Sequence, residues 1–345
     1  MTQMIITKDK LAQVLKLWQE SYQVLVPSAK KGAGFVELSG SAENPLPERY
    51  RNTVVPPKSA FLPPFEKFFD FEKTAEGTKL TLPENEHRNR LIFGIRPCDA
   101  ASFGMLDKVF GDTYNDDYFL RRRDKTILVG LACTNPYDSC FCTSLGIDPG
   151  SSPDVDIMLT ETARAYLAEP VSERGAKLLE ASSLEKGGAE EVKTAETARD
   201  DAWSKIRRQV DIQGMVEKVT GAHANEAFWQ EIGAKCVTCG VCTFLCPTCY
   251  CFDINDEALA GAGNGSRVRN WDSCSFEAYT QMPMENPREE KWRRVRQKVS
   301  HKYSYFPELF DTIACTGCGR CIRLCPVNWD IAETLTTMPA AAPEQ

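Results

Sequence analysis

Residues 236–247 read CVTCGVCTFLCP and residues 315–326 read CTGCGRCIRLCP. Both stretches follow the pattern C-x2-C-x2-C-x3-C-P, the spacing with which bacterial ferredoxins bind two 4Fe–4S clusters. Zinc sites also use C-x2-C pairs, but a zinc ion needs four ligands and no third closely spaced cysteine. Two copies with the proline in the same place predict a dicluster domain.

The spacing also predicts how the two clusters share their ligands. In such runs the first three cysteines bind one cluster, and the fourth binds the cluster of the other run. The proline after the fourth cysteine fixes the direction in which the chain leaves the loop. We therefore expect crossed sets, with cluster 1 bound by Cys236, Cys239, Cys242 and Cys325, and cluster 2 bound by Cys315, Cys318, Cys321 and Cys246.

Composition narrows the class of protein. The chain has 345 residues, 42% of them hydrophobic, with a formal net charge of −7 and a pI of about 5.3. These values give no indication of a nucleic-acid surface, and no stretch approaches the roughly 18 apolar residues of a membrane helix. Near the N-terminus, charged residues come before any long apolar run, so no signal peptide is expected. Fifteen cysteines, mostly at metal-ligand spacings, favour a reducing, anaerobic cytoplasm over a disulfide framework.

The N-terminal part reads as an α/β domain. Two short apolar runs, 91–95 and 127–132, have the length of buried strands, and residues 99–110 between them read as a helix. Such a unit predicts parallel strands with a right-handed crossover. A first helix is expected within residues 8–22. The fold class is therefore α+β, with an N-terminal α/β domain and a helical ferredoxin-like dicluster domain.

Four more cysteines lie where these strands end. Cys98 follows the first strand, Cys133 follows the second, and Cys140 and Cys142 come in the next loop. Because the carboxyl ends of parallel strands share one edge of a sheet, the four thiols are expected to converge beside a helix N-terminus. They predict a third 4Fe–4S site. The alternative is that Cys98 and Cys133 are ordinary buried thiols.

We expect residues 1–180 to form the α/β domain, 181–225 a solvated helical connector, 226–337 the dicluster domain, and 338–345 a disordered tail. Within the dicluster domain a helix is expected from Asp330 to Thr337. Three cysteines of the insert between the two runs stay unassigned, because three thiols alone do not complete a four-iron cube. They are Cys249, Cys251 and Cys274.

The charged residues near the cysteine runs allow two interpretations each. The basic stretch 288–302 is either a docking face for an acidic partner or an exposed helix that balances nearby carboxylates. Lys235 and Arg320 flank expected ligands, and they either raise the potential of the clusters or are solvated loop charges. The three histidines, His87, His223 and His301, are expected to be surface or packing residues and not metal ligands.

The sequence has cluster ligands but no motif for substrate chemistry. Residues 32–37 read GAGFVE, which lacks the third glycine of a dinucleotide loop, and no P-loop is present. This combination predicts a non-catalytic subunit that carries electrons. Two alternatives stay open, a flavin-binding oxidoreductase in its own right and a scaffold with zinc or structural clusters.

Several longer motifs add a resemblance to a known family. The sequences RPCDAASFGMLDKVF, CTNPYDSCFCTSLG, CVTCGVCTFLCPTCYCFDI, WDSCSFEAYT, RVRQKVSHKYSYF and CTGCGRCIRLCPVNWDI resemble the iron–sulfur β subunit of cytosolic sulfhydrogenases. That family is similar to the A subunit of anaerobic sulfite reductase and to a component of heterodisulfide-reductase-associated flavin oxidoreductases. The resemblance spans about residues 58–331 and supports the third 4Fe–4S cluster. It implies a hetero-oligomer in which this subunit transfers electrons between an NAD(P)H-oxidising FAD flavoprotein and a separate catalytic subunit.

Overall fold

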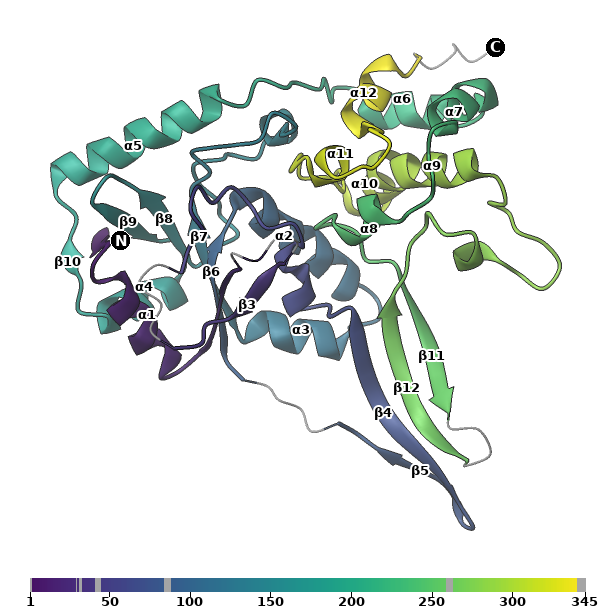
Figure 1. Cartoon of the computed structure of the whole chain (residues 1–345), viewed down its shortest axis with the longest axis horizontal. Helices are drawn as coiled ribbons and strands as arrows, with labels where there is room; N and C mark the ends of the chain where they lie inside the picture. Colours follow the sequence, from purple (N-terminus) through teal and green to yellow (C-terminus); the bar gives the residue numbers. More distant parts are fainter. Residues whose placement is uncertain are drawn as a thin grey trace.

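The computed structural model describes residues 2–28, 30, 33–40, 45–83, 88–258 and 263–339. His87 and the expected tail from residue 340 lie outside these ranges. Figure 1 shows a sheet-containing N-terminal half, a helical C-terminal half beside it, and a long arm of strands that projects away from both. Within the described residues no helix is both long and apolar enough to cross a membrane.

An eight-stranded sheet forms the centre of the N-terminal half. Its inner strands are parallel and its outer strands are antiparallel. In spatial order the strands are β10 (Glu185–Lys186), β1 (Met4–Thr7), β9 (Ala165–Pro170), β8 (Ile157–Glu161), β7 (Thr126–Leu131), β6 (Arg90–Ile95), β2 (Gln23–Pro27) and β3 (Phe35–Glu37).

The two predicted strands and their crossover are confirmed. β6 pairs with β7 in parallel, and α2 (Pro97–Phe110) follows β6 with α3 (Asp117–Asp124) after it. Successive residues of a strand point to opposite faces, so Leu91 packs with α1 (Leu11–Gln19) while Ile92 packs with α2. Both faces of the sheet are thus covered by helices, which explains why these strands are apolar throughout.

The segment after residue 180 is more closely attached to the sheet than a solvated connector would be. α4 (Glu173–Ala181) leads into β10, which pairs with β1 at the edge of the sheet. α5 (Ala189–Ser204) follows and buries Ala195 and Ala202, while Arg199 donates to Thr160 Oγ1 at 2.8 Å. The helix is therefore exposed along one side and packed against the sheet along the other (Figure 1).

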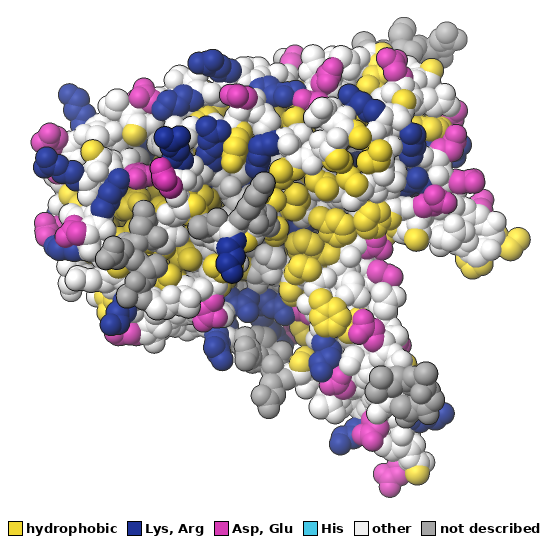
Figure 2. Space-filling model, in the orientation of Figure 1, with side chains coloured by type: hydrophobic (Ala, Val, Ile, Leu, Met, Phe, Trp, Pro, Cys, Tyr) yellow, Lys and Arg dark blue, Asp and Glu magenta, His cyan; other side chains and the backbone are white. Residues whose placement is uncertain are grey.

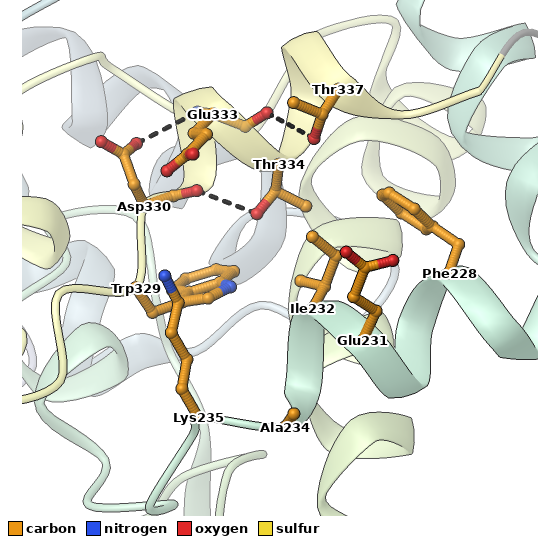
Figure 3. A pocket seen from close by; sticks show the side chains of 10 residues that line it. All are labelled: Phe228, Glu231, Ile232, Ala234, Lys235, Trp329, Asp330, Glu333, Thr334 and Thr337. Atoms are coloured by element: carbon orange, nitrogen blue, oxygen red, sulfur yellow. Dashed lines mark hydrogen bonds between the residues drawn. The ribbon is translucent and has the colours of Figure 1, made fainter.

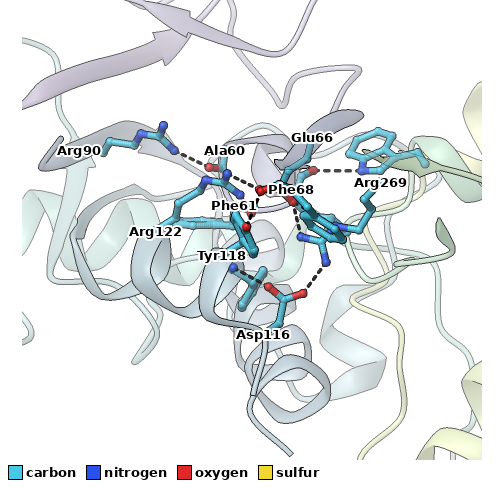
Figure 4. A network of polar contacts seen from close by, with 12 residues as sticks. Ala60, Phe61, Glu66, Phe68, Arg90, Asp116, Tyr118, Arg122 and Arg269 are labelled. Atoms are coloured by element: carbon cyan, nitrogen blue, oxygen red, sulfur yellow. Dashed lines mark hydrogen bonds and ion pairs between the residues drawn. The ribbon is translucent and has the colours of Figure 1, made fainter. Parts of the chain in front are cut away.

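The arm is a four-stranded antiparallel sheet built from two distant parts of the chain. In spatial order its strands are β11 (Phe252–Ala258), β12 (Asn264–Trp271), β4 (Phe65–Thr74) and β5 (Gly77–Thr81). The base of this arm contains a buried polar network (Figure 4) in which Glu66 binds Arg269 and Arg122, and Arg269 also binds Asp116. Arg269 and Glu66 are almost fully buried, so each charge depends on its partner.

The C-terminal half packs helices around an apolar core that includes Trp229, Val299 and Leu335. The predicted helix at the C-terminus is confirmed as α12, which begins after an Asp330 side chain that accepts from the amides of Ala332 and Glu333. The helices are α6 (Met215–Ala222), α7 (Glu226–Gly233), α8 (Val241–Phe244), α9 (Lys291–Ser300), a π-helical turn (His301–Tyr305), α10 (Phe306–Phe310), α11 (Arg320–Arg323) and α12 (Ile331–Thr337).

A fully buried ion pair joins the N-terminal half to the C-terminal half. Arg320 at the start of α11 donates to both carboxylate oxygens of Asp99 in the first turn of α2, at 2.6 and 2.8 Å. Both side chains are fully buried. The interpretation of Arg320 as a solvated loop charge was therefore wrong, because its bidentate partner removes it from solvent. Lys235, in contrast, is exposed.

Candidate iron–sulfur centres

The first cysteine run begins as a loop, continues through α8, which contains Cys242, and ends at Cys246 just after that helix. The amide of Thr238 donates to Cys236 Sγ at 3.4 Å, and the amide of Trp329 donates to Cys325 Sγ at 3.1 Å. Such N–H···S bonds stabilise thiolate sulfur. Burial raises the pKa of Cys236, and the nearby sulfurs of Cys242, Cys239 and Cys325 add to this effect. The structure therefore places Cys325 of the second run close to the cysteines of the first.

This group lies near the surface of the helical half. Cys239 is the most accessible of the fifteen cysteines, all of which are described. Beside the group, Lys235 and Trp329 line a pocket between α7 and α12, whose open side also carries Glu231 and Glu333 (Figure 3). The group therefore lies beside an accessible surface that carries both positive and negative side chains.

Cys246 of the first run lies near the cysteines of the second run. Burial raises the pKa of Cys321, and the sulfurs of Cys246, Cys318 and Cys315 are close enough to add to it. Burial likewise raises the pKa of Cys315, which again has Cys246 beside it. Each run thus has the fourth cysteine of the other run near it.

The four cysteines of the N-terminal half line one cavity. Cys98, Cys133, Cys140 and Cys142 surround it, and Cys318 of the second run completes its wall. The Cys140 thiol donates to the carbonyl of Cys318 at 3.7 Å. Burial raises the pKa of Cys140 to about 12, so its free thiol is neutral and would lose its proton on binding a metal. The strand ends thus converge as their position in the sequence indicated.

Arg96 holds the backbone around this cavity. Its guanidinium donates to the carbonyls of Leu131 and Ala132 at 3.1 and 2.5 Å, just before Cys133. It also donates to the carbonyls of Tyr50 and Arg51. Arg96 therefore ties the end of β7 to the loop that covers the cavity, a role that the arginine alone did not reveal in the sequence.

One side of the basic stretch 288–302 faces inward, which neither sequence interpretation anticipated. Arg294, Lys298 and Lys302 are buried on the inner side of α9 and its π-helical extension. Lys298 Nζ lies 3.8 Å from Cys249 Sγ, and Lys302 donates to Thr248 Oγ1 at 2.8 Å. Their spacing of four residues places them on one helix face, and this periodicity is the signal by which they could have been found.

Lys298 and Lys58 differ in pKa, although burial disfavours the charged form of both. Burial opposes the charge of Lys298, but the sulfurs of Cys242 and Cys249 outweigh it, so that its pKa lies well above the usual value. Lys58 reaches the same region from the N-terminal half, where burial lowers its pKa to about 8. Lys298 contacts a thiol directly, whereas Lys58 donates to the Cys249 carbonyl at 2.6 Å, and the positive charge of Lys302 lowers the pKa of Lys58 further.

The cysteine groups suit iron–sulfur clusters in their chemistry. Every member is a thiol, and buried amides and lysines surround the sulfurs, as an anionic cluster requires. In the described part of the chain, no three or more His, Cys, Asp or Glu side chains are arranged to hold a single metal ion. His301 is turned toward Tyr250 and not toward a thiol, since its Nε2 lies 3.1 Å from the Tyr250 hydroxyl.

The helical half is a 4Fe–4S dicluster domain, since residues 235–329 match that family. This match confirms the prediction from the two cysteine runs. Over a longer range, the chain is 28% identical to sulfhydrogenase 2 subunit beta of Pyrococcus furiosus, across 289 residues that make up 83% of each protein. The resemblance to sulfhydrogenase β subunits is thereby confirmed. No solved structure matches the chain.

Proposed function

We propose that this protein is the electron-transfer subunit of an oxidoreductase complex. It passes single electrons through 4Fe–4S clusters between a flavoprotein subunit that oxidises NAD(P)H with FAD and a separate catalytic subunit. The catalytic subunit is of the hydrogenase, sulfite reductase or heterodisulfide reductase type. The similarity to a sulfhydrogenase β subunit and the dicluster domain support this assignment.

The observation that carries the proposal is the continuity of the thiol groups. Cys246 connects the first run to the second, and Cys318 connects the second run to the cavity of the N-terminal half. Cofactors held by these groups would be neighbours, and electron tunnelling becomes slow when redox centres are far apart. The three groups therefore define a path through the molecule from the N-terminal half to the surface near Cys239.

We propose the following ligands for each cluster. Cluster 1 takes Cys236, Cys239, Cys242 and Cys325, cluster 2 takes Cys315, Cys318, Cys321 and Cys246, and cluster 3 takes Cys98, Cys133, Cys140 and Cys142. When bound, each cluster accepts and releases one electron. The chain supplies amide donors to the sulfurs, excludes water by burial, and places lysine charges that favour the reduced, more anionic state.

The division of the chain follows from this assignment. We propose that residues 1–180 and the packed segment 181–225 support cluster 3, while residues 226–337 hold clusters 1 and 2. The subunit works in a hetero-oligomer in an anaerobic cytoplasm, where exposed clusters survive. Its partners are proteins, and neither a nucleic acid nor a membrane is among them.

Metal and flavin content test this proposal. The full chain is purified without oxygen, and iron, sulfide and flavin are measured per polypeptide. At least about twelve irons with no flavin, and a visible absorption that bleaches on reduction with dithionite, are expected, since three four-iron clusters alone account for about twelve. Zinc in place of iron would contradict the electron-transfer function.

A second measurement separates this proposal from a flavoenzyme. NADH and NADPH are added to the isolated chain, and cluster reduction is followed by absorbance. No reduction is expected until a flavoprotein partner is supplied. Bound flavin together with rapid reduction by NAD(P)H would show that the chain itself accepts hydride, which is the alternative function.

A further inference from the structure

Three thiols stand outside the proposed cluster sets, and the fold brings them together. Cys251 precedes β11 and Cys274 follows β12, so the base of this hairpin brings them side by side. The amide of Asp272 donates to the Cys251 carbonyl at 2.9 Å, and the thiols of Cys251 and Cys274 interact directly. Cys249 interacts directly with Cys246, a proposed ligand of cluster 2, and is close enough to Cys274 for the two sulfurs to influence each other.

Two buried cations lie against this group. Lys298 Nζ is 3.8 Å from Cys249 Sγ and donates to the Cys242 carbonyl at 2.7 Å. Lys58 donates to the Cys249 carbonyl at 2.6 Å and its ammonium lies 4.4 Å from the centre of the Trp271 ring. The residues are 3% and 2% exposed, respectively. They reach the group from different halves of the molecule.

These cations have no carboxylate partner. Among the ion pairs of the described residues, none includes either lysine. A buried ammonium group without an anion costs several kcal/mol, and carbonyl groups satisfy its protons but not its charge. The nearby groups that can become anionic are thiols, and a thiol loses its proton when it binds a metal. The pair of lysines is therefore matched to metal-bound sulfur.

We propose that Cys249, Cys251 and Cys274 hold a further iron–sulfur cluster, with Lys298 and Lys58 as its buried counter-cations. Three thiolates suit a three-iron cube, or a four-iron cube whose last iron binds water or a small anion. Both forms share the same protein ligands. The site lies beside clusters 1 and 2, since Lys298 contacts Cys242 of cluster 1, and Cys249 interacts directly with Cys246 of cluster 2.

The decisive comparison uses the full chain, loaded with iron and sulfide without oxygen. Native mass spectrometry counts the clusters, and the variant C249S/C251S/C274S is measured beside wild type. The triple variant is expected to lose about three or four irons and to keep the rest. Ser273→Ala is the matched control, because it changes the residue before Cys274, whose hydroxyl accepts from the Ser275 amide, and keeps every thiol. An equal iron content in wild type and triple variant would overturn the site.

Two further measurements keep the test independent of how the triple variant folds. The wild-type chain alone is expected to carry more than three clusters, and three or fewer would overturn the site. Lys298→Met is expected to release the extra cluster to a chelator about tenfold faster, as when an outer partner of a metal ligand is lost. Equal release by wild type and Lys298→Met would contradict the role of this lysine.

The site and the proposed function fail in different ways. If the chain holds clusters 1 to 3 and the triple variant loses no iron, electron transfer stands and only the further site falls. If the chain binds no iron at all, the electron-transfer function falls with it. The spectrum distinguishes the two forms of the site, because an oxidised three-iron cluster is paramagnetic and an oxidised four-iron cluster is not.

Discussion

Replacing Arg320 with methionine should strongly destabilise the contact between the two halves. The change leaves the fully buried Asp99 carboxylate without the two hydrogen bonds, at 2.6 and 2.8 Å, that balance its charge. Removing one partner of a buried ion pair costs about 3–5 kcal/mol. We expect a loss of this size in the free energy of unfolding, because methionine fills the volume but supplies no charge.

The assay is denaturant unfolding of the loaded chain without oxygen, followed both by tryptophan fluorescence and by cluster absorbance. Arg320→Met is compared with Asp99→Asn and with the double variant, which removes both charges. The double variant should lose less free energy of unfolding than the sum of the two single losses, because it leaves no buried charge without a partner. Arg293→Met is the control, since its ion pair with Glu290 is exposed and such pairs contribute about 1 kcal/mol or less. Additive losses would refute the reasoning.

Three other outcomes are expected. Gly317→Ala should destabilise the fold more than Gly146→Ala. Both glycines have positive φ, but only at Gly317 would an added Cβ lie within 2.5 Å of another part of the backbone. Equal melting temperatures of the two variants would contradict this. Burial and nearby cations lower the pKa of His301 to about 4. The unfolded chain therefore binds this proton first, and stability should fall by about 1 kcal/mol from pH 7 to 5.5 in wild type but not in His301→Gln. Glu66→Gln leaves part of the buried charge of Arg269 without a partner and should lower the free energy of unfolding by at least about 3 kcal/mol, measured by denaturant unfolding. A loss below about 1 kcal/mol would disprove the coupling.

The parts of the fold that depend on local pattern could be predicted from the sequence. The cysteine runs have fixed short spacing, and the continuous apolar runs at 91–95 and 127–132 indicate strands that are covered on both faces. Their order along the chain also brings the four N-terminal thiols to one edge of the sheet.

The arm could not be predicted in the same way. Its strands come from residues 65–81 and 252–271, and nothing local in either segment indicates the other. The pairing depends on a buried network that forms only when Glu66 and Arg269 meet across the two segments.

The basic stretch shows a different limit. Lysine and arginine are usually exposed, so a run of them reads as a solvated helix. Lys298 and Lys302 are buried because distant thiols and carbonyls surround them, and that environment is a property of the fold. The four-residue spacing was visible in the sequence, but it became informative only once the inner face of α9 was known.

The wall that Cys318 adds to the N-terminal cavity has a consequence for biosynthesis. Chains emerge from the ribosome N-terminus first. Cys98 and Cys133 therefore leave the ribosome long before the loop that packs on them, in which the Gly317 carbonyl accepts from the amide of Phe141 at 2.9 Å. During translation the N-terminal thiols stay accessible until the second cysteine run has been made, and the cavity closes only when that run folds onto it. Loading of this cavity with any metal is thus tied to synthesis of residues far along the chain.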